Sequence, residues 1–157
     1  MKRIMGATVA AVVLLAAAEA KEDTVKTEWA ALEGTWTLTK MEANGKSLLK
    51  KGERPPQLVI KDGKISAKGG PKGGAEEAPV PRLDPKRKPK WITIPNFKGG
   101  DPAKGVTAIG IYELKGDLLR VCVQAVETAR LKERAKERPK TFDSSRGLLL
   151  VFKRKAK

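Results

Sequence analysis

The clearest hairpin signal in the chain is Leu58-Val59-Ile60-Lys61-Asp62-Gly63-Lys64-Ile65-Ser66-Ala67. Asp62-Gly63 suits the positive φ angles of a type I′ turn, and β-branched residues flank the turn on both sides. The stretch therefore predicts two short antiparallel strands joined by a tight turn.

Upstream of this hairpin the residue pattern also has a period of two. We expect one strand face to carry Trp36 and Leu38, and the other to carry Thr37, Thr39 and Met41. Asn44-Gly45 follows as a second candidate turn. The strand therefore continues the β pattern toward the N-terminus.

A short amphipathic helix is expected before that strand. Val25, Trp29 and Leu32 stand at positions i, i+4 and i+7, which place their side chains on one helix face. Gly34 would end the helix, because glycine adopts positive φ angles freely. The helix would lay its apolar face on the rest of the domain.

Downstream, the strand pattern is interrupted by two irregular segments. Gly69–Lys90 is rich in Gly, Pro and Lys and is expected to be a long mobile loop, with room for one edge strand near Val80–Leu83. Residues 126–137 favour a solvated helical insertion. Strand character is found in residues 91–94, 106–114, 118–124 and 148–153. About seven or eight short strands result, which favours an antiparallel barrel or tight sandwich, since closure leaves few unpaired edges.

The N-terminal residues have the pattern of a secretory signal peptide. Lys2 and Arg3 precede an apolar run, and Ala18-Glu19-Ala20 offers small residues two apart. The run is shorter than the roughly 18–20 residues that cross a bilayer, so cleavage after Ala20 is favoured over an uncleaved anchor. We expect residues 1–20 to be a signal peptide and residues 21–157 to form one secreted or periplasmic domain with no transmembrane segment.

The composition is strongly basic, with 33 Lys and Arg against 18 Asp and Glu and a formal net charge of +15. Residues 1–20 hold two basic residues and one acidic residue, so the remainder keeps a charge of about +14. This charge admits anionic partners such as an envelope polymer, although scattered lysines also serve solubility alone. The candidate docking patch consists of Lys86, Arg87, Lys88 and Lys90. No specific nucleic-acid partner is indicated.

Common catalytic constellations are missing from the composition. The chain has no histidine and a single cysteine, Cys122, which excludes Ser-His-Asp and Cys-His pairs, thiolate zinc sites and an intramolecular disulfide. Asp62, Asp101 and Asp117 stand within a few residues of lysines in turn sequences. We therefore expect no enzyme activity, cofactor or metal site, and we expect Cys122 to be a buried thiol.

Several blocks carry a family resemblance. Gly34-Thr35-Trp36 resembles the opening of lipocalin-like barrels, and Leu83-Asp84-Pro85-Lys86-Arg87-Lys88-Pro89-Lys90-Trp91-Ile92 resembles a run in a secreted lipocalin-like domain family of unknown function that is expanded in planctomycete bacteria. Residues 104–114, 116–122 and 138–142 are similar to further blocks of that family. The resemblance spans residues 29–154 and implies an up-and-down barrel with Trp36 closing one end. The Gly-rich Gly69–Ala78 and the helical segment between Cys122 and Arg138 depart from the family.

Two classes of function follow from the sequence. The first is a non-enzymatic secreted binding module that holds a small apolar or amphipathic ligand, with Trp36, Leu38, Trp91 and Tyr112 as candidate ligand contacts. The alternative is a structural or interaction protein that docks through its basic surface to an anionic envelope polymer or another secreted protein, and a secreted hydrolase inhibitor would share the same scaffold. A hollow barrel favours the first class and a filled barrel the second.

Overall fold

A computed structural model describes residues 22–69, 75–97 and 105–156 of the chain. A helix over residues 22–32 precedes the first strand. The strands are β1 (Gly34–Ala43), β2 (Lys46–Ser47), β3 (Gln57–Lys61), β4 (Lys64–Lys68), β5 (Ala75–Ala78), β6 (Arg82–Asp84), β7 (Lys90–Ile94), β8 (Val106–Lys115), β9 (Leu118–Glu127) and β10 (Leu148–Arg154). The expected signal peptide lies outside the described residues. Within the described ranges, no helix has the length and apolarity needed to cross a membrane.

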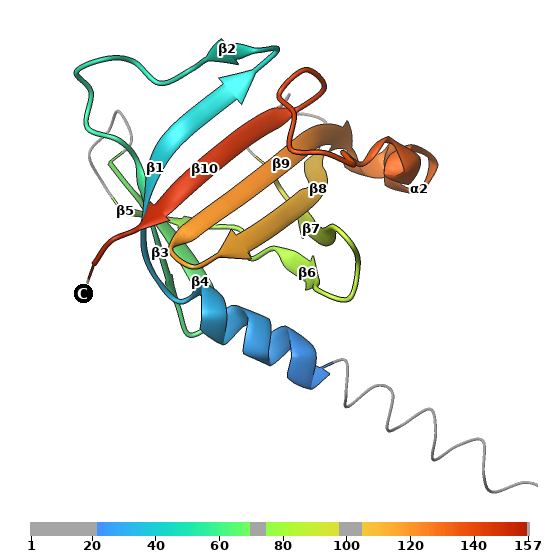
Figure 1. Cartoon of the computed structure of the whole chain (residues 1–157). Helices are drawn as coiled ribbons and strands as arrows, with labels where there is room; N and C mark the ends of the chain where they lie inside the picture. The colour runs from blue at the N-terminus through green and yellow to red at the C-terminus, as the bar shows by residue number, and fades with distance from the viewer. Residues whose placement is uncertain (1–21, 70–74, 98–104, 157) are drawn as a thin grey trace, which may run out of the picture.

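The protein is mostly β, with one antiparallel sheet curled into a half-barrel (Figure 1). Its strand order is β5-β4-β3-β1-β10-β9-β8-β7-β6, and β2 pairs only with β1. The ten strands exceed the expected seven or eight, because the short β2 and the edge strand β5 were not expected, whereas β6 lies near the edge strand expected at Val80–Leu83. These two edge strands are consecutive in the chain and are joined by residues 79–81.

Both predicted hairpin turns are confirmed. Asp62 and Gly63 have φ angles of 51° and 69°, and Leu58 of β3 pairs with Ala67 of β4. Asn44 and Gly45 have φ angles of 51° and 70° between β1 and β2. Asn, Asp and Gly are the residues that tolerate positive φ, so the turn chemistry fixed both reversals.

A β-bulge in β1 corrects the expected distribution of side chains over its two faces. The pairing of β1 with β10 shifts between Leu38, which opposes Phe152, and Lys40, which opposes Val151. Because the extra residue resets the alternation, Met41 packs on the same core as Leu38 instead of the opposite face.

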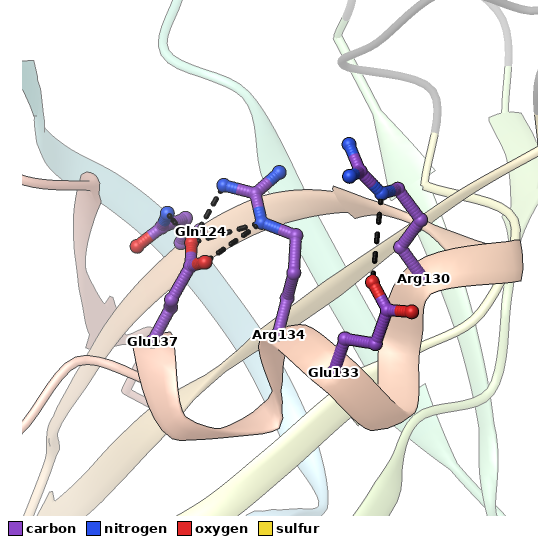
Figure 2. A network of polar contacts seen from close by, with 5 residues as sticks. All are labelled: Gln124, Arg130, Glu133, Arg134 and Glu137. Atoms are coloured by element: carbon purple, nitrogen blue, oxygen red, sulfur yellow. Dashed lines mark hydrogen bonds and ion pairs between the residues drawn. The ribbon is translucent and has the colours of Figure 1, made fainter.

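The convex side of β7 to β10 is covered by the segment that joins β9 to β10. This segment begins with three helical turns, η1 (Thr128–Arg130), α2 (Leu131–Arg134) and η2 (Ala135–Glu137), as expected for the helical insertion. Figure 2 shows its solvent-facing polar contacts, in which the Arg134 guanidinium and the Gln124 amide donate to the Glu137 carboxylate. A small second core lies on this side, with Ile111, Cys122 and Leu149 at its centre.

Candidate functional site: an apolar cavity in the half-barrel

A cavity of about 330 Å³ lies inside the half-barrel. Side chains of β3 and β4 form one wall, β7 to β10 form the other, and the connection from β5 to β6 contributes Pro79 and Pro81. The wall residues follow the period of two along each strand, as Leu119 and Val121 of β9 illustrate. The alternation that packs the core therefore also makes this space apolar.

The N-terminal helix contributes Trp29 and Leu32 to the cavity. Beneath them Trp36 is fully buried, and its indole Nε1 donates to the Leu32 carbonyl oxygen at 2.8 Å. Trp36 therefore supports this end of the half-barrel from below.

Arg154 at the end of β10 ties the helix to the sheet. Its guanidinium lies 4.3 Å from the centre of the Trp36 ring. The two terminal nitrogens donate to the carbonyl oxygens of Ala31 and Glu33, both at 2.7 Å. These carbonyls end the helix and lack intrahelical partners, and a cation there is also favoured by the helix dipole. The first and last elements of the described chain thus close one end of the cavity together.

Three polar residues are found among the described residues that line the cavity, namely Glu76, Glu77 and Tyr112, and no Lys or Arg is found among them. The two glutamates are exposed and lie on edge strand β5. Tyr112 is 1% exposed. The polar contribution to the wall is therefore small and carries negative charge only.

The Tyr112 hydroxyl is buried at the cavity wall, with the Glu28 carboxylate as its hydrogen-bonding neighbour. Burial, followed by the charge of the nearby Glu28 carboxylate, raises the pKa of Tyr112 well above its ordinary value. Lys90 Nζ donates to Glu28 Oε1 at 2.6 Å and lies 5.8 Å from the centre of the Tyr112 ring. Tyr112 therefore stays neutral at the cavity wall, beside the Glu28 carboxylate.

The structure brings together only part of the predicted ligand contacts. Tyr112 lines the cavity, whereas Trp36 and Leu38 are buried in the core and are not among the described lining residues. Trp91 packs on the second core of the convex side, with the guanidiniums of Arg87 and Arg138 at 4.4 and 4.6 Å from its ring centre. Trp91 thus contacts two cations and is not among the described lining residues of the cavity.

Sequence reasoning did not name the other lining residues as contacts. Periodicity assigned Trp29 and Leu32 to the apolar face of the helix and Leu119 to an apolar strand face. Their inward orientation toward the cavity could therefore be predicted from the sequence. The sequence did not indicate Glu76 and Glu77 as lining residues, because their Gly-rich segment predicted a loop where the structure has β5.

The predicted docking patch lies in the turn between β6 and β7. Lys86, Arg87 and Lys88 are exposed there. Arg87 donates to Asp84 Oδ2 at 3.2 Å, and Lys90 is engaged by Glu28. Two of the four cations therefore already have acidic partners.

The Cys122 thiol is fully buried. Its Sγ donates to the Asp143 carbonyl oxygen at 3.4 Å, and burial raises the pKa of the thiol. Burial therefore opposes thiolate formation. Within the described ranges, no three His, Cys, Asp or Glu side chains are grouped so as to hold a metal ion.

No protein-family model, curated protein or solved structure matches the chain. Its function is therefore inferred from the cavity and the surfaces described above.

Proposed function

We propose that this protein is a non-enzymatic binding module that holds one small apolar or amphipathic molecule inside the half-barrel. The observation that carries the proposal is the cavity of about 330 Å³ with its apolar wall. Small-molecule sites typically span about 300–1,000 Å³ and are mostly apolar with a few polar groups. Each Å² of apolar ligand surface removed from water would contribute about 25 cal/mol to binding.

We further propose a lipocalin-like up-and-down architecture and secretion of the protein. Support for the architecture comes from the adjacency of consecutive strands from β6 to β10 and from the helix that precedes β1. The buried Trp36 at the end of the cavity is consistent with the same proposal. Support for secretion comes from the sequence pattern of residues 1–20.

Docking to an anionic envelope polymer is a second candidate function. The exposure of Lys86, Arg87 and Lys88 in one turn favours it, together with the net charge of +15. Retention on an anionic matrix should then weaken between low and physiological salt and should fall in a Lys86→Gln/Lys88→Gln variant. Retention independent of salt would exclude electrostatic docking.

Filling the cavity provides the direct test of ligand binding. Ala67 lines the cavity, and Ser66, its neighbour on β4, is not among the described lining residues. We expect Ala67→Trp to reduce binding of the neutral fluorescent probe N-phenylnaphthylamine at least about tenfold, because the indole would occupy the probe's volume. The matched Ser66→Trp variant should bind as the wild type does.

Native mass spectrometry of the protein purified from its own host provides an independent measurement. An added mass that disappears in Ala67→Trp would support the proposal. A clean apo mass together with no probe binding by the wild-type protein would contradict it.

A further inference from the structure

The chain between β1 and β3, residues 44–56, forms a loop that is fastened to β1 at both ends. Its first part is β2, which pairs with the end of β1 that lies away from the N-terminal helix (Figure 1). The Leu48 backbone N–H then donates to the Met41 carbonyl oxygen at 2.8 Å. At the other end, the Leu38 backbone N–H donates to the Pro56 carbonyl oxygen at 2.9 Å. These bonds fix the position of the 44–56 loop on the sheet.

The two leucines of the 44–56 loop have opposite surroundings. Leu49 packs against the same core as Leu38, whereas Leu48 is 48% exposed, the highest exposure of a large apolar side chain among the described residues. Burial of Leu48 would require the loop to give up the Leu49 packing or the backbone bond to Met41. The loop therefore holds one large apolar side chain in water.

Cations surround this leucine in the sequence of the loop. Four exposed basic residues share the loop with it, namely Lys46, Lys50, Lys51 and Arg54. Glu53 is the one acidic residue of the loop, so its formal charge is +3. Lys50 Nζ lies 3.7 Å from Glu53 Oε1, and no ion pair of the other three cations is found within the described ranges. The loop thus presents an exposed apolar group together with uncompensated positive charge.

The exposed Leu118 provides a contrast. It is 41% exposed and directly follows Asp117 in the turn between β8 and β9. The cations near it have acidic partners, since Lys115 pairs with Glu113 at 3.2 Å and Arg154 with Asp117 at 3.4 Å. Exposure of a leucine alone therefore does not distinguish the 44–56 loop, but exposure together with free cations does.

The leucine decides between two kinds of anionic partner. A hydrophilic polyanion would engage the lysines and leave Leu48 in water, so Leu48 would add nothing to its binding. The interface of an anionic bilayer would remove Leu48 from water while its headgroups attract the lysines. Each Lys or Arg near such a surface strengthens binding about fivefold, since it contributes about 1 kcal/mol. The residue pattern of the loop therefore fits a lipid surface better than a soluble polymer.

We propose that the 44–56 loop docks onto the surface of an anionic phospholipid bilayer, with Leu48 entering the interface and Lys46, Lys51 and Arg54 facing the headgroups. This surface is separate from the proposed ligand site, because no residue of the loop is among the described lining of the cavity. One leucine with a few cations gives a reversible association rather than a permanent anchor, because stable anchoring takes stronger apolar signals.

Co-sedimentation with lipid vesicles tests the proposal. At low salt we expect the protein to bind vesicles of equal parts phosphatidylcholine and phosphatidylglycerol, and not to bind vesicles of phosphatidylcholine alone. Leu48→Ser should weaken this binding at least about threefold, because it removes the apolar contact. The matched Leu118→Ser variant should bind as the wild type does. No binding by the wild type, or full binding by Leu48→Ser, would overturn the proposal.

A charge-matched pair of double variants locates the electrostatic part. Lys46→Gln/Lys51→Gln should weaken binding to the anionic vesicles about tenfold. Lys86→Gln/Lys88→Gln removes the same charge from another exposed turn and should keep most of the binding. Equal losses in the two variants would show that total charge carries the association, which would overturn the role of the loop. Probe binding in the cavity is a separate measurement, so these outcomes leave the binding module untouched.

A soluble polyanion and an environment-sensitive label distinguish the lipid surface from other anionic partners. Leu48→Ser should be retained on dextran sulfate as the wild type is, and an equal loss there would overturn a lipid-specific role. In a Cys122→Ala background, nitrobenzoxadiazole on Leu48→Cys should shift its emission to shorter wavelength with the anionic vesicles, whereas the label on Leu118→Cys should not. An unshifted Leu48→Cys label would show that the loop stays outside the interface.

Discussion

Individual residues differ widely in how much their contacts contribute, and burial separates them. Arg154 stacks on a fully buried Trp36 and satisfies two helix carbonyls. Arg134 contacts Glu137 with good geometry, but this pair faces solvent (Figure 2). The two guanidiniums are similarly exposed, at 26% for Arg154 and 34% for Arg134, but Arg154 contacts a buried ring and two backbone carbonyls whereas Arg134 contacts an exposed carboxylate, so the two contacts differ in consequence.

Replacement of Arg154 by lysine should destabilise the protein. Lysine keeps the charge but cannot donate to both Ala31 and Glu33 in one planar fork, and it stacks less well on Trp36. We expect the free energy of unfolding to fall by about 1–3 kcal/mol, measured by urea denaturation. The control Lys153→Ala changes an exposed neighbour and should have little effect. Equal stability of Arg154→Lys and the wild type would contradict this role.

The buried thiol of Cys122 predicts a pH dependence of stability. Its pKa is raised in the folded protein, so the unfolded chain loses this proton at lower pH than the folded one. The thiol's contribution is therefore present in full below the unfolded pKa of about 8.5 and is lost as pH rises toward the folded value. The stability difference between the wild type and Cys122→Ala should shrink across that window. A difference independent of pH up to strongly alkaline conditions would show that the thiol ionises equally in both states.

At the level of elements, the helical insertion is held by Arg138, the residue after its helical turns, more than by the turns themselves. Arg138 directly follows η2, and its Nη1 donates to the carbonyl oxygens of Ile92 at 2.6 Å and Gly110 at 2.7 Å. Its Nη2 donates to Thr93 Oγ1 at 3.1 Å. Burial lowers the pKa of this arginine, and the charge of Asp84 offsets that effect only in part. The hydrogen bonds to the Ile92 and Gly110 carbonyls therefore replace those that the guanidinium would make with water.

Arg138→Lys should loosen the insertion while leaving the half-barrel folded. One ammonium cannot reproduce the contacts with β7 and β8, so we expect a loss of about 2 kcal/mol in the free energy of unfolding. Hydrogen exchange should accelerate between residues 128 and 147 before it does in β8 or β9. Arg134→Lys, in the same insertion, serves as the exposed control and should leave exchange unchanged. Uniform acceleration across the sheet would contradict local anchoring.

The elements were predictable where a local rule fixed the backbone. The turns at Asn44-Gly45 and Asp62-Gly63 and the helix face of Trp29 followed from residue chemistry and spacing. The face of Met41 did not, because a bulge is set by pairing with β10 rather than by the β1 sequence. β5 escaped for a similar reason, since its residues AEEA become a strand only through pairing with β4.

For the whole molecule, an antiparallel β architecture with a leading helix was predictable, and the curvature that creates the cavity was not. Alternation says which side chains share a face, as Leu119 and Val121 do, but it does not say whether facing side chains meet or leave space between them. Trp36 was a candidate ligand contact, but it is fully buried and is not among the described lining residues. The hollow depends on volumes contributed by strands distant in sequence, which no single stretch encodes.

The hydrogen bonds from Arg154 to the carbonyls at the helix end can form only late in synthesis of the chain. They join residues separated by 121 and 123 positions, so the helix is synthesised long before its partner exists. A nascent chain that still lacks β10 would leave the apolar side chains of Trp29 and Leu32 exposed to solvent beside an incomplete sheet. Under the proposed binding function, a ligand would therefore enter only after synthesis is complete, when β10 pairs with β1 and Arg154 contacts the helix.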